Sequence, residues 1–373
     1  MDSFFAVSAP GLEPFTAREM HALNLASVSE EPGGVLFRGD LAVLYRANLH
    51  LRTASRILAR LGNFFYATTS SQLEQRLASL PWERFLSPRQ PVSLRVTCHA
   101  SKLYRSDAVA RTASRALEQR LGAPSPLIKP DEENDQPSQL VVIRLADDKC
   151  TVSVDSSGTL LHKRGYRQAV AKAPLRETLA AAMLMASGWD LSSPLLDPFC
   201  GSGTIPIEAA MAALGIPPGL HRRFAFMDWP NFDKSLWQAV LAGASSVSSI
   251  HPVIQASDRD AGAIKSAQAN AERAGVSEHI DFQCQAVSSI QPPSGIGWVV
   301  TNPPYGLRLG EGKDLRNLYA RFGNVLRLKC PGWSVSVLCS DPALLGQMRL
   351  KLDTSLAMVN GGIRVRLGRG IVP

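Results

Sequence analysis

The chain has 373 residues, of which 45% are hydrophobic and 19% charged; this globular composition excludes low-complexity disorder and collagen and suggests two or three domains. No run of about 18 uncharged apolar residues is present to span a membrane, and an acid at position 2 without a basic segment argues against a secretory signal, so we expect a cytoplasmic protein. The net charge of +8 is uneven: residues 51–130 hold 13 Lys and Arg against 4 Asp and Glu, and residues 301–373 hold 11 against 4.

Residues 1–65 predict a small unit of strands and helices. It opens with a strand over 4–7 and a helix over about 12–25, and a strand over 35–39 follows a glycine turn. Residues 40–64 form one long amphipathic segment whose apolar residues recur at helical spacing. Its arginines recur near every fourth residue, at Arg46, Arg52, Arg56 and Arg60. Such a row is either a face that binds a polyanion such as RNA or a plain solvated face.

Residues 66–155 read as a second mixed unit. The pattern predicts helices near 71–80 and 106–121, a strand over 91–99, and two further strands on either side of Asp147 and Asp148. An acidic loop separates the second helix from the last two strands. This mixture predicts an α/β domain of about 90 residues.

Residues 156–173 are rich in Gly and Ser and then basic, and we interpret them as a linker whose charges could touch RNA. From residue 174 to 373, strand and helix patterns alternate. This order predicts a parallel, doubly wound sheet, in which ligands bind beyond the carboxyl ends of the strands.

The first motif in this sheet is a glycine-rich loop between a strand and a helix, at 195–204. A dinucleotide fingerprint would need Gly or Ala where Pro206 stands, and the signatures of a P-loop and of a nucleophile elbow are absent. The acid at the strand end would repel a phosphate but suits a ligand with amines and hydroxyls, such as S-adenosylmethionine; a turn without a ligand is the alternative. The expected cofactor-binding residues here are Asp197, Phe199, Gly201, Ser202, Gly203 and Thr204.

The next two strands end in weaker signals. Asp258 has two oxygens that could hold both ribose hydroxyls, although an acid is common at an exposed strand end. Gln285 and Ala286 end the following strand, where a side chain usually meets the adenine. We add these three residues to the expected cofactor site.

The fourth motif is Asn302-Pro303-Pro304-Tyr305, which follows a strand. The exocyclic amine of a nucleobase is a poor nucleophile because its lone pair is delocalised into the ring. The Asn302 side-chain oxygen and the Pro303 carbonyl could accept its N–H groups, the prolines stiffen the loop, and Tyr305 could stack on an extruded base. We therefore expect these four residues to be catalytic, with Asn302 also touching the cofactor.

Together, the two motifs resemble those of amino-methylating class I S-adenosylmethionine-dependent methyltransferases. More narrowly, the chain resembles the THUMP-domain RNA guanine-N2 methyltransferases over nearly its whole length, through segments such as 160–167, 301–310 and 359–362. The block at 217–229 is more similar to the branch acting on 23S ribosomal RNA than to the tRNA branch. Two departures are Gln285, where relatives often carry an acid, and Leu307, where the family usually has Glu.

The resemblance implies a fold class and a domain order. It implies a ferredoxin-like domain at 1–65, a THUMP RNA-binding domain at 66–155, a linker at 156–173 and a Rossmann-like class I methyltransferase domain at 174–373. It also implies a structured RNA partner, with S-adenosylmethionine as the cofactor. The residues expected to contact RNA are Tyr305, Arg308, Arg56, Lys102 and Arg105.

Three other functions are compatible with these motifs: a tRNA guanine-N2 methyltransferase, a DNA adenine-N6 methyltransferase, and a non-catalytic RNA-binding protein with a residual cofactor fold. The six cysteines include no C-x-x-C pair, so we expect no metal.

Overall fold

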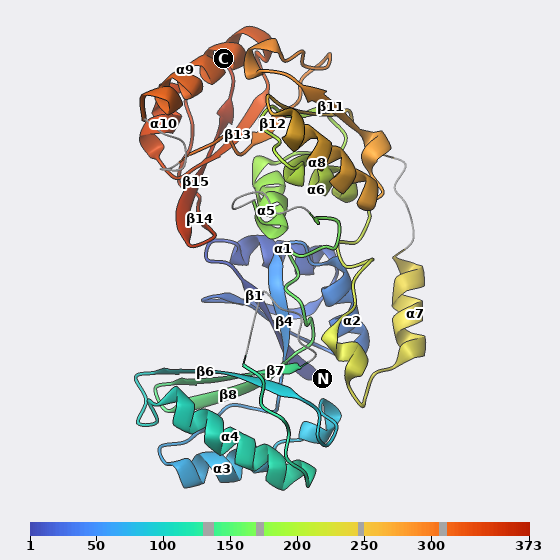
Figure 1. The fold of residues 1–373 in the computed structure, drawn as a ribbon, viewed down its shortest axis with the longest axis vertical. Helices are drawn as coiled ribbons and strands as arrows, with labels where there is room; N and C mark the ends of the chain where they lie inside the picture. The colour runs from blue at the N-terminus through green and yellow to red at the C-terminus, as the bar shows by residue number, and fades with distance from the viewer. Residues whose placement is uncertain (130–137, 169–174, 245–249, 306–311) are drawn as a thin grey trace.

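The computed structural model describes residues 1–129, 138–168, 175–244, 250–305 and 312–373. The chain folds around two β-sheets that lie one beyond the other along the longest axis of an elongated molecule (Figure 1). The C-terminal sheet and its helices occupy one end, and strands β6 to β8 with helices α3 and α4 occupy the other.

The N-terminal sheet is continuous across the first two predicted domains, because β4 pairs with β1 on one side and β8 on the other. Its strand order is β2-β3-β1-β4-β8-β7-β6, with β5 paired to β8. The strands are β1 (Asp2–Ser8), β2 (Ala26–Glu31), β3 (Gly34–Gly39), β4 (Ala54–Arg60), β5 (Phe65–Tyr66), β6 (Val92–His99), β7 (Gln139–Ala146) and β8 (Lys149–Asp155). The helices are α1 (Glu13–Ala22), α2 (Leu41–His50), α3 (Ser70–Ala78) and α4 (Ser106–Leu121).

The long helix predicted over residues 40–64 is wrong in its second half. Helix α2 ends at His50, the backbone is extended at Leu51, and β4 begins at Ala54. Strand β4 lies between two other strands, and Ile57, Leu58 and Ala59 are buried in succession. A short apolar run that is buried on both faces of a sheet does not differ in periodicity from a buried helical turn, which explains the error.

The C-terminal sheet has the order β11-β10-β9-β12-β13-β15-β14. Strands β11 to β13 in this order are parallel, and β15 runs antiparallel to both of its neighbours. The strands are β9 (Leu195–Asp197), β10 (Ile254–Asp258), β11 (Ile280–Cys284), β12 (Trp298–Thr301), β13 (Ser334–Cys339), β14 (Ala357–Asn360) and β15 (Ile363–Ile371). The helices are α5 (Glu177–Ser187), α6 (Thr204–Ala213), α7 (Lys234–Gly243), α8 (Ala261–Arg273), α9 (Gly312–Lys329) and α10 (Pro342–Gln347).

Helices cover both faces of this sheet. Leu195 and Val300 belong to one hydrophobic core and their neighbours Leu196 and Val299 to another, as the alternation of side chains along a strand requires. The predicted fold class, a doubly wound and mostly parallel sheet after an α+β region, is confirmed.

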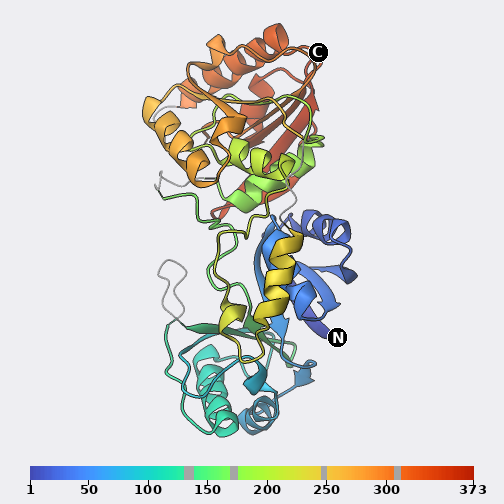
Figure 2. The same ribbon diagram turned by 90° about the vertical axis from the view of Figure 1, so that its right-hand side faces the viewer.

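An aromatic segment of the C-terminal half packs on the N-terminal sheet. The ring of Phe226 stacks on Tyr45 with centroids 4.4 Å apart, and Trp229 donates from Nε1 to Gln139 Oε1 over 2.8 Å. Helix α7, which follows, lies alongside α2 (Figure 2). The segment at 217–244 therefore joins the two halves of the molecule.

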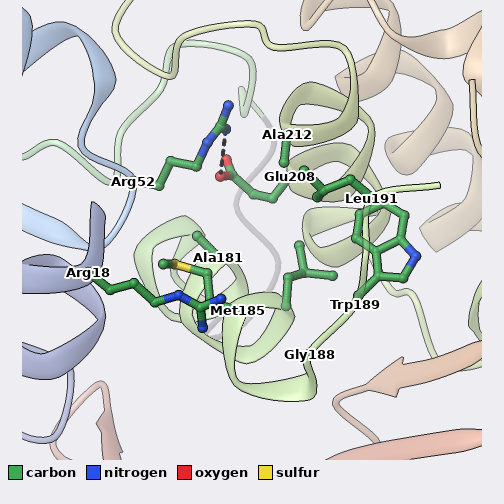
Figure 3. A pocket seen from close by; sticks show the side chains of 10 residues that line it. Arg18, Arg52, Ala181, Met185, Gly188, Trp189, Leu191, Glu208 and Ala212 are labelled. Atoms are coloured by element: carbon green, nitrogen blue, oxygen red, sulfur yellow. Dashed lines mark ion pairs between the residues drawn. The ribbon is translucent and has the colours of Figure 1, made fainter. Parts of the chain in front are cut away.

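The predicted linker is tightly packed over its described part, 156–168. Arg164 is buried and lies 3.4 Å from the Glu208 carboxylate, so its charge faces the protein interior and not RNA. Beside this pair, a pocket of about 200 Å³ lies between α1, α5 and α6, where Arg52 and Glu208 form an ion pair at 4.0 Å (Figure 3). No residue predicted to bind cofactor or base lines this pocket.

Candidate active site at the carboxyl ends of four strands

The four predicted motifs meet at one edge of the C-terminal sheet. They follow β9, β10, β11 and β12, which lie side by side in the order β11-β10-β9-β12. Because these strands are parallel, their carboxyl ends all reach the same edge, where doubly wound sheets bind ligands.

The glycine loop leaves space for a ligand at one position and none at another. Gly201 has φ +53° and a Cβ built on it would meet nothing within 4 Å. Gly203 has φ +83° and caps α6, and a Cβ there would lie 3.0 Å from that of Ala267 on α8. Gly201 thus keeps the loop open, and Gly203 lets α6 pack against α8.

The Asp258 side chain, at the end of β10, is hydrogen-bonded to the glycine loop. Its Oδ2 accepts a hydrogen bond from the Gly201 N–H at 3.1 Å, and its Oδ1 accepts one from the Asp260 N–H at 3.0 Å. Each carboxylate oxygen has a second lone pair that can accept from a ligand hydroxyl.

Asp197 is buried beneath the two motif loops. Its Oδ1 accepts hydrogen bonds from the Thr301 hydroxyl at 2.6 Å and from the Phe199 N–H at 3.2 Å. Burial raises the pKa of this carboxyl to about 7, against the lowering effect of those two hydrogen bonds. Asp197 thereby links the glycine loop to the strand that carries Asn302.

Gln285 and Ala286 lie beyond the end of β11. The Gln285 N–H donates to the Asp258 carbonyl over 2.9 Å, which fixes the loop next to the Asp258 side chain. The Gln285 amide nitrogen donates to Gln283 Oε1 over 2.9 Å, so its own Oε1 can still accept from a ligand.

The Thr204 side chain is engaged by a residue that the sequence did not single out. Arg167 donates from Nη2 to Thr204 Oγ1 over 2.6 Å, and its Nε lies 3.2 Å from the buried carboxylate of Glu177. Asn270 supports the same loop by donating to the Ser202 carbonyl over 3.0 Å. The basic segment at 160–167 was the available signal, but its pattern could not show that it faces the protein interior.

The Asn302 loop presents an unpaired acceptor. The Oδ1 atom of Asn302 is buried and has no hydrogen-bond partner among the described residues. The loop is fixed from behind, since the Tyr319 hydroxyl donates to the Pro304 carbonyl at 3.4 Å. Tyr305 accepts a hydrogen bond at its hydroxyl from Asn360 Nδ2 over 3.0 Å. A buried amide oxygen without a donor fits a ligand that brings its own N–H.

These features fit S-adenosylmethionine and a nucleobase together. The open space at Gly201 and the free lone pairs of Asp258 suit a ribose and a methionine moiety, and the Asn302 oxygen suits an amine beside them. The described residues contain no group of three or more His, Cys, Asp or Glu that could hold a metal.

The residues expected to contact RNA are scattered. Arg308 lies outside the described residues. Arg56 is buried in β4, where its Nη1 donates to the Asp155 carboxylate and to the Gly158 carbonyl, so we remove it from the expected RNA surface. Lys102 and Arg105 are exposed in the loop between β6 and α4, and these two elements lie at the end of the molecule opposite β12 (Figure 1).

The other arginines of the predicted basic row do not share a face either. Arg46 donates to the Leu23 carbonyl, Arg52 to the Ile216 carbonyl and Arg60 to the Ser153 hydroxyl. These internal partners, together with the division of 40–64 into a helix and a strand, exclude a single arginine face.

Three family models match the chain. One described as the RMKL-like methyltransferase domain matches residues 164–367, one described as the RlmL ferredoxin-like domain matches 3–58, and one described as the THUMP domain matches 67–155. Among the described residues, no helix is long and apolar enough to cross a membrane.

Similar proteins cover nearly the whole chain. A protein of Synechocystis sp., provisionally named an RNA methyltransferase, is 34% identical over 96% of this chain and 94% of its own length. The ribosomal RNA large subunit methyltransferase K/L of Shewanella amazonensis is 36% identical over 97% of this chain, which spans 52% of that relative. A crystal structure of a provisionally named methyltransferase complexed with SAH is 31% identical, with a TM-score of 0.87 over 99% of this chain and 97% of that one.

Proposed function

The chain belongs to the RMKL-like methyltransferase family, and we propose that it methylates the exocyclic N2 amine of a guanine in large-subunit ribosomal RNA. Its cofactor is S-adenosylmethionine, and a neighbour of the same fold is complexed with SAH. We further propose a cytoplasmic location, since the proposed substrate is a cytoplasmic RNA.

One observation carries the chemistry. The buried Asn302 Oδ1 atom lacks a donor among the described residues and lies in the loop after β12, next to the glycine loop after β9. An N–H of the target amine would supply the missing donor, and the Pro303 carbonyl would accept the second N–H. Two acceptors around the nitrogen favour a lone pair that is localised on that atom and directed at the methyl group.

The remaining residues of the site hold the reactants in place. The bound cofactor supplies an electrophilic methyl group on a sulfonium. Asp258 accepts hydrogen bonds from the ribose hydroxyls of the cofactor, and Gly201 lets the loop backbone lie close to the cofactor. Tyr305 stacks on the extruded base. As the N–C bond forms, the S–C bond of the sulfonium would break, and the cationic amine would then lose a proton to water, so the site needs no strong base.

RNA docking is supported by a surface of exposed residues on and beside strands β5 and β8. Phe64 and Tyr66 are 51% and 63% exposed, and the Lys149 ammonium lies 3.8 Å from the Phe64 ring centroid. Tyr66 pairs with Lys149 across β5 and β8, and the Lys102 N–H donates to Asp148 in the adjoining turn. Exposed aromatic rings beside cations suit unpaired nucleotides, and the cations suit phosphates.

The choice of ribosomal RNA over tRNA or DNA rests on the curated relatives. The chain spans about half the length of the large-subunit methyltransferases that it matches, and these relatives are named for ribosomal RNA. The THUMP model at 67–155 and the exposed rings of Phe64 and Tyr66 support RNA as the polymer.

Nucleoside mass spectrometry tests the substrate. Ribosomal RNA and tRNA would be separated from cells with and without this gene, and we expect N2-methylguanosine to be lost from large-subunit rRNA alone. Loss from tRNA alone would keep the chemistry and change the substrate. Unchanged N2-methylguanosine in both RNAs would contradict the proposal and direct attention to DNA adenine or to a non-catalytic role.

The variant Asn302→Ala tests the chemistry in the purified enzyme. We expect the single-turnover rate to fall about 100-fold or more, because the amine loses an acceptor that acts in the transition state. Cofactor affinity, measured by calorimetry with S-adenosylhomocysteine, should fall much less. A near-normal rate would show that Asn302 does not activate the amine.

A further inference from the structure

The hairpin of β14 and β15, at one edge of the C-terminal sheet, contacts the loop at 302–305, which we call the catalytic loop. Asn360 pairs with Ile363, and the turn between them consists of Gly361 at φ +56° and Gly362 at φ +84°. Two consecutive residues with positive φ are typical of the tightest hairpin turns. The turn thus places the last side chain of β14 at a fixed position.

Asn360 is not needed to form that turn. It is absent from the described non-glycine residues that have positive φ, so the two glycines carry the backbone conformation on their own. Its side-chain amide instead donates a hydrogen bond to the Tyr305 hydroxyl over 3.0 Å, although the two residues are 55 positions apart in the sequence. The turn therefore does not account for Asn360, whereas the contact with the catalytic loop does.

The hairpin is fixed at its other end. Met358 is 1% exposed and belongs to the core on one face of the C-terminal sheet. Gly11 of the N-terminal region fits so closely that a Cβ on it would lie 2.2 Å from the Ala357 carbonyl oxygen. Figure 1 shows β14 reaching down to the N-terminal domain beside α1. Strand β14 is therefore held between the N-terminal domain and the sheet, and Asn360 is held with it.

From these contacts we infer that Asn360 is a positioning residue for methyl transfer. It holds the hydroxyl of Tyr305, so that the half-buried ring stays in the orientation that stacks on the target base. This inference rests on the proposed function, because it assigns Asn360 to the same base site. It also gives the N-terminal domain a direct structural connection to that site, through Gly11 and β14.

A double-mutant cycle tests this role in the full-length enzyme. The variants are Asn360→Ala, Tyr305→Phe and their combination, assayed on rRNA from a strain that lacks the gene. Each single change should lower kcat/KM for RNA about tenfold, the size expected for one hydrogen bond, and the combination should lower it no further. Affinity for S-adenosylhomocysteine and the unfolding temperature serve as controls and should change little.

A conservative variant separates positioning from simple packing. Asn360→Asp keeps a hydrogen bond, now donated by the tyrosine hydroxyl, and should recover most of the activity that Asn360→Ala loses. The same Asp variant should give no recovery when combined with Tyr305→Phe.

Three outcomes would overturn the inference. One is normal kcat/KM for Asn360→Ala, and another is losses that multiply in the double variant; either leaves the proposed function in place. If the wild-type enzyme methylated no guanine, the proposed function would fall and the role of Asn360 with it.

Discussion

At the scale of single residues, Asp197 connects the two halves of the candidate site. One carboxylate oxygen accepts from Phe199 in the glycine loop and from Thr301, which precedes Asn302. The group is fully surrounded by protein, and burial is the main reason that its pKa rises from 3.8 to about 7. A buried carboxyl that is hydrogen-bonded to both loops supports a positioning role between the proposed cofactor and base sites.

The raised pKa predicts a pH dependence of stability. Because the folded carboxyl keeps its proton to a higher pH than the unfolded one, stability of the cofactor-free protein should fall between about pH 4 and pH 7. The variant Asp197→Asn removes this titration, so its free energy of unfolding relative to wild type should rise across that window, by up to about 4 kcal/mol. Urea unfolding of both proteins at pH 5 and pH 8 measures the difference. Parallel pH profiles would show that the carboxyl ionises normally.

At the scale of elements, a comparison of Gly11 with Gly33 shows how closely strand β14 packs against the N-terminal domain. Gly11 and Gly33 both have φ +89°, and the N–H of each donates to the carboxylate of Glu13. A Cβ on Gly33 would meet nothing within 4 Å, whereas one on Gly11 would overlap the Ala357 carbonyl oxygen of β14. The two positions share a backbone conformation and differ in what lies beside them.

This pair supplies a matched test. Gly33→Ala should cost only the strain of a left-handed alanine, about 1 kcal/mol. Gly11→Ala should cost about 2–4 kcal/mol in total, because β14 must also move away, and it should lower RNA methylation beyond its effect on stability. Thermal unfolding and kcat/KM for both variants decide the point. Equal effects of the two substitutions would show that the contact with β14 is unimportant.

At the scale of the whole molecule, strand β8, which carries Lys149, and strand β12, which precedes the Asn302 loop, lie toward opposite ends of the long axis (Figure 1). The halves are joined by polar contacts, among them the ion pair of Arg52 with Glu208, and by the packing of aromatic residues of 217–244 on helix α2. Under the proposed function, one RNA would be held at a distance from the guanine that reacts. The proposed docking surface would then help to select a nucleotide by its distance from that surface.

Separate variants of the docking surface should weaken RNA binding without slowing chemistry. Lys149→Gln should lower the affinity and reduce the dependence of log Kd on log salt by about 1, as loss of one phosphate contact does. Tyr66→Ala should cost about 1–3 kcal/mol of binding, the value of one stacked base, with little change in that slope. Fluorescence anisotropy with rRNA fragments measures both, and Lys265→Gln on α8 is the control. Affinity unchanged by either substitution would place the RNA elsewhere.

The amino-acid sequence was sufficient to predict the fold class and the methyltransferase family. Each of the two motifs is a short contiguous loop. The loop at 197–204 must let its backbone lie close to a ligand, and the loop at 302–305 must supply acceptors for an amine, and a few neighbouring residues meet each requirement. The alternation of strands and helices after residue 174 likewise depends on local periodicity. The alternation predicted a doubly wound sheet, and the resemblance of the motifs to a known family implied a class I methyltransferase of the THUMP type; the fold and the family models confirm both.

The side chains that support those loops could not be predicted from the sequence and became evident from the fold. Arg56 could not be distinguished from a surface arginine, because its partner Asp155 lies 99 residues away. Residues 359–362 of the β14–β15 hairpin were noted only as part of the family resemblance, and helix α7 was not noted at all. The sequence could not show what they contact, because contacts such as Asn360 with Tyr305 join distant parts of the chain. Whether a charged side chain forms an ion pair in the interior or is exposed to solvent depends on which strands become neighbours. The periodicity of a sequence does not show which strands are adjacent.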